Sequence, residues 1–514
     1  HITRKQSLDG SIPTGFQRTA IIGVEGEIPL KNKTIRLIQL SLEEDSCREV
    51  SDIGHTRIYR TDRLGMPLIE TVTYPDCVNP EEVMEACNYI RFLNRSTGKV
   101  RTGIGAGRED VNVSCKGGTR VEIKGVAHTK WIPELTHNEA FRQWALLHIK
   151  DALKQQVADP AKWKPRAREL NFYMFGFPSA ALTEAEQKGH KIIAINLPDF
   201  RGILSHFTQP GKSFANEISE RLKVIACLEL PNMTHSEEIE PTIAENDFVK
   251  IREMLKAKEN DSQIIIWGPD ADMKTALETI EERCRMAFEK VPNETRKSFA
   301  DGTTIFERVL PGADRMYPDT DSKPIPLEDK QITDTEKNLP TEIVDRYKQM
   351  KKWGIPEDTF HYIFTNNLFP IMERIISELK VNPVLVGTFF GHRLKFVEGH
   401  YTCPGNFPYP VLFDLFKFLK DNNLQFDLLR LMLPILYEHP KMDFESVLNS
   451  MKFKKIPEKE ILSNVPFLKE KFASIRRSQD SKDEHDWIMG QLKTMATGNI
   501  SPTVLSKHIN TETK

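Results

Sequence analysis

The stretch IQLSLEED, residues 38–45, sets the pattern of the first part of the chain. Its residues alternate between two sets, Ile38, Leu40 and Leu42 against Gln39, Ser41 and Glu43. This period of two is typical of a β-strand. The strand runs directly into Glu44 and Asp45 and therefore ends in acidic residues.

A helix is expected farther along, over residues 79–98. Asn79 suits the N-cap, Pro80 suits the first helical position and Gly98 suits the C-terminal stop. The apolar residues of its buried face are Val83, Ala86, Cys87, Ile90 and Leu93. The segment therefore predicts an amphipathic helix after the first strands.

A β-hairpin is expected around the turn Gly117-Gly118. A two-residue turn there places Val113 opposite Glu122. It also places Val111 opposite Lys124, so each face of the hairpin mixes apolar and polar residues. Such a conflict indicates either charges held for function or a β-bulge that shifts the register.

The composition is that of a globular chain with several domains. Its 514 residues suggest about three to five folding units at roughly 100–200 residues each. Hydrophobic residues make up 39% and charged residues 28%, which excludes wholesale disorder. The formal charge is −2, so contact with a nucleic acid would have to come from local clusters of basic residues.

The cellular environment is also indicated by composition. No apolar stretch approaches the roughly 18 residues of a membrane span, so we expect no membrane association. The seven cysteines include no C-x-x-C pair, which argues against a disulfide framework or a cysteine-rich zinc site. A reducing cytoplasm fits this pattern best.

A separate α/β unit is expected from about Gly189 to about Ala300. Its strands and helices are expected at 191–197, 214–226, 263–267 and 273–290. Loop and strand character then returns, and helix signals dominate from Pro340 onward. The second half of the chain is therefore expected to be helical.

Two acidic clusters are candidate metal ligands. Glu43-Glu44-Asp45 follows a strand, and Glu70 closes the apolar run PLIE. Carboxylates from separate strands suit a hard cation such as Mg²⁺, which bridges nucleotide phosphates. A solvated acidic loop is the alternative interpretation.

Other motifs are less specific. RTGIGAGR, residues 101–108, resembles a glycine-rich phosphate loop but leads into a strand instead of a helix. No GxxxxGK[ST] sequence occurs, which excludes a P-loop. Cys115 has no evident histidine partner nearby and is interpreted as a packing residue.

A basic cluster lies near the C-terminus. Residues 452–477 contain eight basic and three acidic residues, a local excess of five positive charges. Such a cluster is a candidate phosphate-binding face. Phe453, Phe467 and Phe472 are interleaved with it, and a solvated charged face is the alternative.

Six motifs taken together resemble the GatB/GatE family of tRNA-dependent amidotransferase subunits. They are GSIPTGFQRTA (10–20), SLEEDSCR (41–48), DRLGMPLIE (62–70), REDVNVSCKGGTRVEIKGV (108–126), RMYPDTD (315–321) and DWIMGQLKTMATGNISPTVL (486–505). The inserted module, with LPDFRGILSHFTQPGKSFANEISERLK, is similar to the insertion domain of bacterial-type aspartyl-tRNA synthetases. Within the family this insertion favours the E branch over the B branch.

The resemblance implies an α+β multidomain fold in which an antiparallel-sheet cradle is interrupted by an α/β module and followed by all-α domains. The implied domains are a catalytic cradle (1–188), a synthetase-like insertion (189–303), a continuation of the cradle (304–335), a helical domain (336–405) and a YqeY-like tail (406–514).

The resemblance also implies a two-step ligase reaction. ATP would phosphorylate the γ-carboxyl of glutamate misacylated on tRNA(Gln), and ammonia would displace the phosphate to give Gln-tRNA(Gln). The implied cofactors are ATP and Mg²⁺. The ammonia would come from a GatD-type partner, a glutaminase resembling an asparaginase, in a cytoplasmic heterotetramer of two such pairs.

Site residues follow from the same resemblance. Glu44 and Glu70 match family positions that ligate Mg²⁺, so we expect them to converge on one cavity, and Lys124 joins them in the implied catalytic set. The implied cofactor-binding residues are Arg18, Arg63, Glu122, Arg315 and Asp321. The expected tRNA-binding residues are Lys454, Lys455, Arg476 and Arg477.

One family motif has no counterpart in the sequence. The other two metal ligands of the family come from a G-L-E-[IV]-H strand, which does not occur here. We expect a truncation ahead of His1 instead of a divergent site, because the downstream motifs are intact.

Two other function classes compete with this interpretation. The insertion alone would suit an enzyme related to aspartyl-tRNA synthetase, although Phe141-Arg142-Gln143-Trp144 lacks the acid of the second class II motif. Formation of an aspartyl-adenylate would favour that class. A non-catalytic tRNA-binding or scaffold protein would bind tRNA without turning over ATP.

Overall fold

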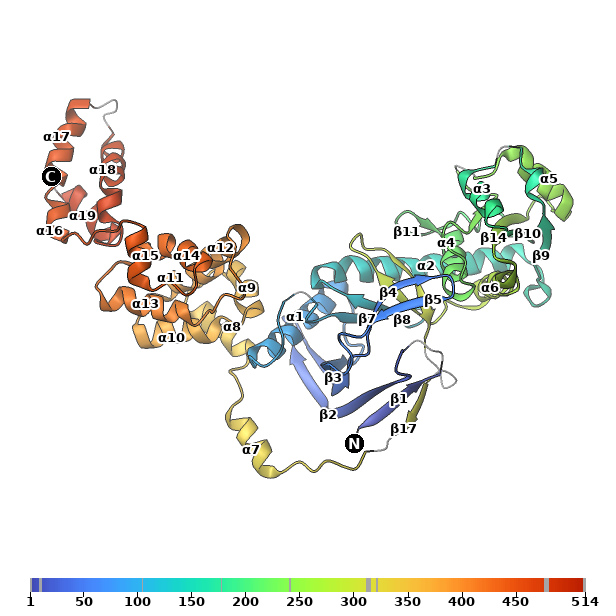
Figure 1. Ribbon diagram of the computed structural model, residues 1–514, viewed down its shortest axis with the longest axis horizontal. Helices are drawn as coiled ribbons and strands as arrows, with labels where there is room; N and C mark the ends of the chain where they lie inside the picture. The colour runs from blue at the N-terminus through green and yellow to red at the C-terminus, as the bar shows by residue number, and fades with distance from the viewer. Residues whose placement is uncertain are drawn as a thin grey trace. The chain divides into compact units, whose positions relative to one another are not determined.

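The computed structural model describes residues 2–8, 12–103, 105–176, 178–239, 242–310, 316–319, 322–475 and 480–511. The chain divides into two compact units, which are His1–Ile90 with Arg101–Asp334 and Arg91–Val100 with Thr335–Lys514 (Figure 1). The first unit combines sheets and helices, whereas the second is helical. The prediction of a multidomain α+β protein is therefore confirmed.

The first unit contains a five-stranded antiparallel sheet in the order β17-β1-β2-β3-β6. Its strands are β1 (Thr3–Ser7), β2 (Phe16–Pro29), β3 (Thr34–Glu44), β6 (Pro67–Thr73) and β17 (Met316–Asp319). The predicted strand is thus β3, and it ends in acid as expected. Its polar set points inward, since Ser41 is buried whereas Leu42 is 42% exposed.

Helix α1 (Pro80–Ser96) confirms the predicted helix. The Asn79 side chain accepts a hydrogen bond from the Glu82 backbone N–H, and Gly98 ends the segment with a positive φ of 68°. Ala86 of this helix packs with Ile28 and Ile35 of the five-stranded sheet. The inward face of β3 is therefore apolar near α1 and polar toward Glu43.

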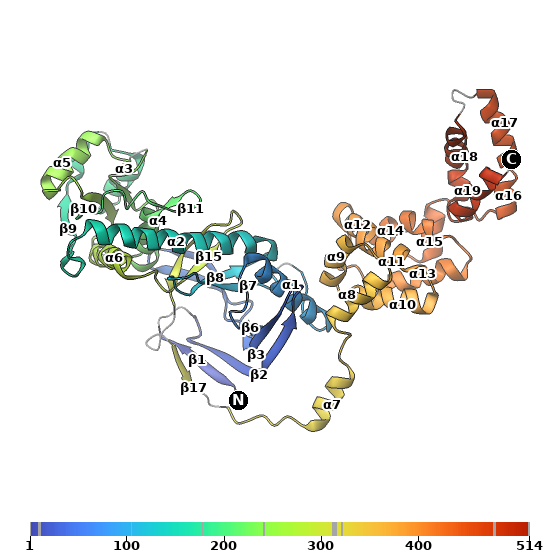
Figure 2. The same cartoon turned by 180° about the vertical axis from the view of Figure 1, so that it is seen from behind.

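A second sheet has the order β16-β15-β8-β7, in which β15 and β8 are parallel. Its strands are β7 (Glu109–Val113), β8 (Val121–Val126), β15 (Glu294–Ser298) and β16 (Thr304–Val309). Helix α2 (Ile132–Gln156) runs along this sheet (Figure 2).

The predicted pairing of the hairpin was wrong by one residue. Val111 pairs with Ile123 and Val113 with Val121, because the connection between the strands, residues 114–120, is longer than two residues. One face of the hairpin is therefore apolar and packs on α2. A register shift, one of the two alternatives, accounts for the apparent mixing of valines and charges; it arises in the connection, whereas the bulge lies beyond these pairs, between Glu109 and Val111.

A third sheet forms a lobe of the first unit, in the order β13-β14-β10-β9. Its strands are β9 (Arg166–Leu170), β10 (Lys191–Leu197), β13 (Met233–His235) and β14 (Ser262–Gly268), and its helices are α3 (Ala180–Gln187), α4 (Phe214–Ile225), α5 (Glu245–Leu255) and α6 (Asp270–Glu289). The predicted strands at 191–197 and 263–267 are confirmed. The lobe sheet already begins at Arg166, ahead of the boundary expected at 189, and β15 belongs to the hairpin sheet.

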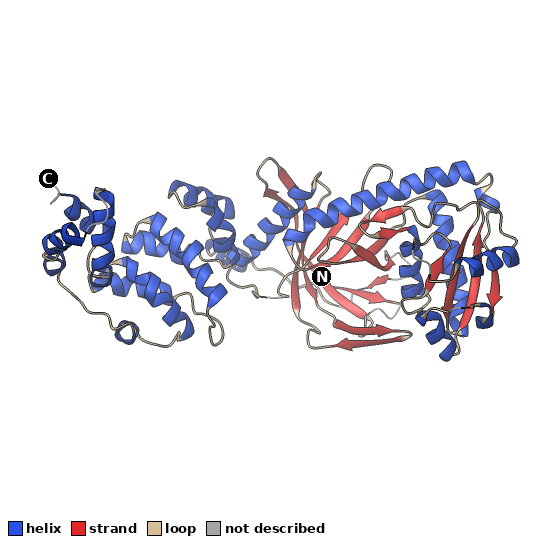
Figure 3. Ribbon diagram, turned by 90° about the horizontal axis from the view of Figure 1, so that it is seen from above, coloured by secondary structure: helices blue, strands red, loops and turns tan. Residues whose placement is uncertain are grey.

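Two small antiparallel pairs complete the strands of the first unit. They are β4 (Arg48–Ile53) with β5 (Thr56–Arg60), and β11 (Phe207–Gln209) with β12 (Lys212–Ser213). Figure 3 shows the strands of this unit beside its helices, of which α2 is the longest. Helix α7 (Asp329–Lys337) spans the point at which the two units divide.

The second unit is built from short helices around two apolar cores. The helices are α8 (Ile343–Lys352), α9 (Phe360–Thr365), α10 (Phe369–Leu379), α11 (Pro383–Thr388), α12 (Lys395–His400), α13 (Val411–Asp421), α14 (Leu429–Glu438), α15 (Phe444–Ser450), α16 (Glu458–Leu462), α17 (Val465–Ile475), α18 (Ser481–Ala496) and α19 (Pro502–Thr511). One core extends from Met350 to Leu448 and the other from Ile461 to Ile509. The expected domain limit at 405–406 falls inside the first core.

Within the described ranges, no helix has the length and apolar character needed to cross a membrane.

Candidate active site

The carboxylates of the two acidic motifs are placed by the pairing of β3 with β6. Ser41 pairs with Glu70 and Glu43 pairs with Leu68. Because paired residues share a face and side chains alternate along a strand, Glu43 and Glu70 lie diagonally on the same face. This is the inward face, which also carries the buried Ser41.

Glu44 lies on the opposite face of the same sheet. The Arg18 backbone N–H donates to its Oε1 at 2.9 Å, and the Arg18 guanidinium lies 3.3 Å from its Oε2. Arg18 also covers the Phe16 ring, 4.8 Å from the ring centroid. The expected convergence of Glu44 with Glu70 is therefore not observed, because the pleat of β3 turns Glu44 away and Glu43 takes that place.

Lys124 is held on the polar face of the hairpin sheet. Its Nζ donates to Asp110 Oδ2 at 2.9 Å and to Glu122 Oε1 at 2.8 Å. Burial lowers the pKa of Lys124, but the two carboxylates outweigh this effect, and the pKa lies above its ordinary value. Burial also raises the pKa of Asp110, but Lys124 outweighs it and the pKa lies below its ordinary range.

Glu43 is within electrostatic reach of the hairpin. Burial, reinforced by the like charge of Glu70, raises the pKa of Glu43 above its ordinary value, against weaker opposing effects of Lys5, Lys124 and Arg108. The polar faces of the two sheets thus lie within electrostatic reach of each other, and we call their charged residues the open cluster. It consists of Glu43, Glu70, Asp110, Glu122 and Lys124.

Arg63 joins the acidic end of β3 to the glycine-rich segment. Its Nε donates to Asp45 Oδ2 at 2.5 Å, and its Nη1 donates to the Gly105 carbonyl at 3.2 Å. Gly105 adopts a positive φ of 73°, which a residue with a side chain adopts only with strain. The segment is therefore a tight turn pinned by a cation close to the open cluster.

The open cluster fits a hard cation through two carboxylates. Burial and then the like charge of Glu70 raise the pKa of Glu43, and a cation bound beside the carboxylate would offset both effects. Mg²⁺ commonly binds one or two carboxylates together with substrate phosphates. Among the residues that the structure describes, no group of three or more histidine, cysteine, aspartate or glutamate side chains could hold a metal ion.

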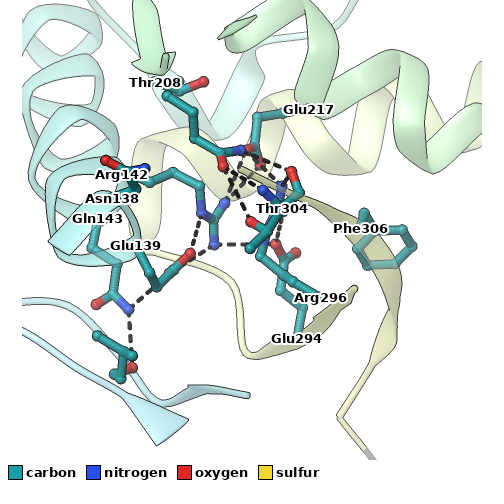
Figure 4. A network of polar contacts seen from close by, with 12 residues as sticks. Asn138, Glu139, Arg142, Gln143, Thr208, Glu217, Glu294, Arg296, Thr304 and Phe306 are labelled. Atoms are coloured by element: carbon teal, nitrogen blue, oxygen red, sulfur yellow. Dashed lines mark hydrogen bonds and ion pairs between the residues drawn. The ribbon is translucent and has the colours of Figure 1, made fainter. Parts of the chain in front are cut away.

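Behind the hairpin sheet lies a second set of charges, which we call the buried network. It consists of Glu139, Arg142, Glu217, Glu220, Arg221, Arg283, Glu294 and Arg296. Figure 4 labels Glu139, Arg142, Glu217, Glu294 and Arg296 of this network. Arg142 is fully buried and contacts Glu139, Glu217 and Glu294 at 2.9 to 3.2 Å. Since its guanidinium is enclosed, Arg142 cannot take the nucleotide-binding role of a class II synthetase arginine.

The remaining expected site residues fall outside the open cluster or outside the described residues. Arg315, Asp321, Arg476 and Arg477 lie outside the described ranges. Lys454 and Lys455 are exposed in the loop before α16, and Lys455 Nζ donates to the Asn422 carbonyl at 2.8 Å. The Lys455 ammonium therefore has a hydrogen bond to the protein, whereas the Lys454 ammonium has none within the described ranges.

The sequence motif indicated Glu44 as the carboxylate that lies beside Glu70. In the structure, Glu43 is the residue that shares a face with Glu70. The signal was present, because the alternation of β3 places Glu43 in the polar set with Ser41. Asp110 was missed since it is the bulged residue of β7. No local pattern indicates the buried network, whose members come from α2, α4, α6 and β15.

The family model described as the GatB/GatE catalytic domain matches residues 1–333. The E subunit of glutamyl-tRNA(Gln) amidotransferase from Methanocaldococcus jannaschii is 30% identical over 514 residues, covering 98% of this chain and 81% of that protein. The protein of the same name from Thermococcus sibiricus is 33% identical over 487 residues, covering 92% of this chain and 76% of its own.

A third relative of that name, from Sulfolobus acidocaldarius, is 34% identical over 404 residues, which are 77% of this chain. The match spans 63% of that protein, less than two thirds of its length. The family match covers the whole open cluster and the buried network. The chain belongs to the GatB/GatE family, and the relatives it resembles are E subunits of glutamyl-tRNA(Gln) amidotransferase.

Proposed function

We propose that this chain is the amidotransferase subunit that converts Glu-tRNA(Gln) into Gln-tRNA(Gln) with ATP, in the cytoplasm. The observation that carries the proposal is the open cluster, in which two carboxylates and a charged lysine from separate sheets lie together inside the matched family domain. This arrangement suits phosphoryl transfer, which depends on positioning and on charge stabilisation.

The reaction has two balanced steps. A γ-carboxylate oxygen of the glutamyl group attacks the γ-phosphorus of ATP, and ADP leaves. Ammonia then attacks the carbon of the acyl phosphate, and inorganic phosphate leaves with loss of a proton. Both steps develop negative charge on oxygen, so a fixed cation beside the reacting group lowers the barrier.

Lys124 is the residue that supplies this fixed charge. Asp110 and Glu122 keep its ammonium protonated at neutral pH and fix its position through two hydrogen bonds. Glu43 and Glu70 would hold Mg²⁺, which would supply positive charge to offset that of the ATP phosphates. Arg63, held by Asp45, presents the glycine-rich turn to the same region.

The partners follow from the chemistry of the substrates. The chain would receive ammonia from a GatD-type glutaminase that resembles an asparaginase, in a heterotetramer of two pairs. The second unit would hold the tRNA, with Lys454, Lys455, Arg476 and Arg477 as contacts to phosphate. Arg315 and Asp321 remain proposed cofactor-binding residues, together with Arg63, Glu122 and Arg18.

The test is reconstitution of the chain with such a partner, Glu-tRNA(Gln), ATP, Mg²⁺ and glutamine or asparagine. Formation of Gln-tRNA(Gln), measured as the amino acid released from tRNA, is the expected result. The Glu70→Gln variant should lose phosphorylation of the glutamyl group while binding tRNA nearly as well as the unchanged chain.

Two results would contradict the proposal. Formation of an aspartyl-adenylate from free aspartate and ATP would show a synthetase-related enzyme. Binding of tRNA without any ATP turnover, with the partner present, would show a scaffold protein.

A further inference from the structure

We propose that Gln143 is a positioning residue, which sets the hairpin that carries Lys124 and Glu122 by joining its turn to the buried network. Gln143 lies on α2, on the side of the hairpin sheet away from the open cluster, and is fully buried. It therefore contacts no substrate and would act only through the hairpin.

The carboxamide of Gln143 makes five hydrogen bonds, one of them accepted by Oε1 from the Cys115 thiol at 3.6 Å. Its Oε1 accepts from the backbone N–H groups of Cys115 at 3.3 Å and Thr119 at 3.2 Å. Its Nε2 donates to the Val113 carbonyl at 3.1 Å and to Glu139 Oε1 at 3.0 Å (Figure 4). Four of the five bonds hold the connection between β7 and β8, so one side chain supports the β-turn that the Gly118 N–H and the Cys115 carbonyl close at 2.9 Å.

The close approach of the turn is visible at Gly118. A Cβ atom added there would lie 2.2 Å from Gln143 Oε1, closer than any real contact. Gly118 is therefore required by Gln143 and not by its own φ, which is not positive. The turn at Gly118 and the Gln143 side chain therefore pack directly against each other.

The same carboxamide connects the turn to fixed charges. Glu139 accepts from Gln143 and is itself held by Arg142 at 2.9 Å. Arg142 contacts Glu217 of α4 and Glu294 of β15, and β15 runs parallel to β8. Strand β8 is thus held at its turn by Gln143 and along its edge by β15. Both Gln143 and β15 contact the buried network, through Glu139 and Glu294.

Lys124 depends on this support because its partners come from different parts of the hairpin. Asp110 lies at the bulge of β7, and Glu122 lies on β8. A shift of β7 against β8 separates the two carboxylates and loosens the ammonium. The role for catalysis rests on the proposed function, whereas the geometry of Lys124 does not.

The main variant is Gln143→Met in the complete complex, which nearly keeps the side-chain volume and removes all five hydrogen bonds of the carboxamide. We expect kcat for Gln-tRNA(Gln) formation to fall about tenfold or more, while KM for Glu-tRNA(Gln) changes less than about twofold. Brief labelling of lysines with an acylating reagent, read by mass spectrometry, should show faster modification of Lys124. Lys150, which lies on α2 as Gln143 does, should be modified at an unchanged rate.

Gln156→Met is the matched control, because Gln156 lies on the same helix, is exposed and donates only to the Arg201 carbonyl at 3.4 Å. It should match the unchanged chain in kcat, KM and Lys124 labelling. If Gln143→Met does not fold, Gln143→Glu replaces it. Its protonated carboxyl can accept the bonds made to Gln143 Oε1 and donate one of the two made by Nε2, whereas the ionised carboxylate donates none and lies against the Glu139 carboxylate. Its Lys124 labelling should therefore rise with pH more than in Gln156→Glu.

The outcomes separate the two proposals. Unchanged labelling of Lys124 in Gln143→Met, or a normal kcat, would overturn the positioning role. Faster labelling in a complex that never forms Gln-tRNA(Gln) would leave the positioning of Lys124 standing and refute the proposed function instead.

Discussion

The two faces of the hairpin sheet carry the same chemical groups in different surroundings. On one face the open cluster sets Lys124, which is 25% exposed, among carboxylates that have no second cation in direct contact within the described part of the chain. On the other face the buried network pairs four arginines with four glutamates, and Arg142 is fully enclosed. The difference is that the network is neutralised internally and the open cluster is not.

This difference separates stability from chemistry. A buried charge costs free energy unless it is paired, so the network holds only while every member is present. The open cluster keeps an unfavourable proximity of Glu43 and Glu70, which a bound cation would relieve. We therefore expect changes in the network to alter folding and changes in the open cluster to alter activity.

The largest effect is expected for Arg142→Ala. It leaves Glu139, Glu217 and Glu294 without their shared cation, and breaking a buried pair in this way costs about 3–5 kcal/mol. Hydrogen exchange of β8 and β15, read by mass spectrometry, should show the loss of protection. The control is Arg18→Ala, whose partly exposed pair with Glu44 is worth about 0–1 kcal/mol. Equal protection in both variants would contradict the comparison.

Glu43→Gln should reduce Gln-tRNA(Gln) formation about 100-fold, or about 2.7 kcal/mol in the barrier, without loss of folding. The reason is that Glu43 shares a face with Glu70 and faces Lys124. Glu44→Gln, one residue along but on the other face, should retain most of the activity. Steady-state rates of the two variants in the complex decide between them. A reversed order would restore Glu44 as the residue of the site.

The dependence of stability on pH should differ between the two faces. Burial and Glu70 raise the pKa of Glu43. Its contribution to the free energy of unfolding is therefore fully present below its pKa in the unfolded state, and is lost as the pH rises through its pKa in the folded state. For Glu217, burial is outweighed by the positive charges of Arg142, Arg296 and Arg283, so its pKa is lowered. Its contribution to the free energy of unfolding is therefore lost as the pH falls.

Thermal unfolding tests these opposite signs. Glu43→Gln should be at least as stable as the unchanged chain at neutral pH, and its advantage should shrink toward pH 4. The unchanged chain should lose stability in acid as Glu217 and Glu294, whose pKa values are both lowered, take up protons. An advantage of Glu43→Gln that grows in acid would show that Glu43 is not destabilised by its neighbours.

The smallest effects are expected in the loop before α16. Lys454→Ala should lower the salt slope of tRNA binding by about one, because each phosphate contact releases about one counterion. Lys455→Ala should in addition destabilise its surroundings by about 1 kcal/mol through loss of the bond to the Asn422 carbonyl. Binding isotherms at several salt concentrations and thermal unfolding of both variants measure the two effects. Identical behaviour of the two lysines would remove the distinction.

Local patterns in the sequence were enough for several elements. The alternation through Ser41 and Glu43 predicted β3, and the cap at Asn79 with the stop at Gly98 predicted α1. The motifs read together also indicated the family that the comparison over residues 1–333 shows. These features could be predicted because periodicity, caps and motifs depend on residues close together in the chain.

The arrangement of the candidate residues was predicted only in part. Glu70 and Lys124 lie in the open cluster, whereas Glu44 lies on the other face of its sheet from Glu70, and the hairpin register was displaced by one residue. Both errors concern which face a side chain occupies. A single bulge or a one-residue change in pairing reverses that face without altering the strand pattern.

The sequence by itself thus determined strand β3, the first helix, the lobe strands at 191–197 and 263–267 and the family. Only the tertiary structure decided that Glu43 meets Glu70 and Lys124, and that Arg142 joins Glu217 to Glu294. Arg142 is 75 positions from Glu217 in the chain, and no local pattern relates them. Their pairing arises because a buried charge must find its counter-charge wherever folding brings one close.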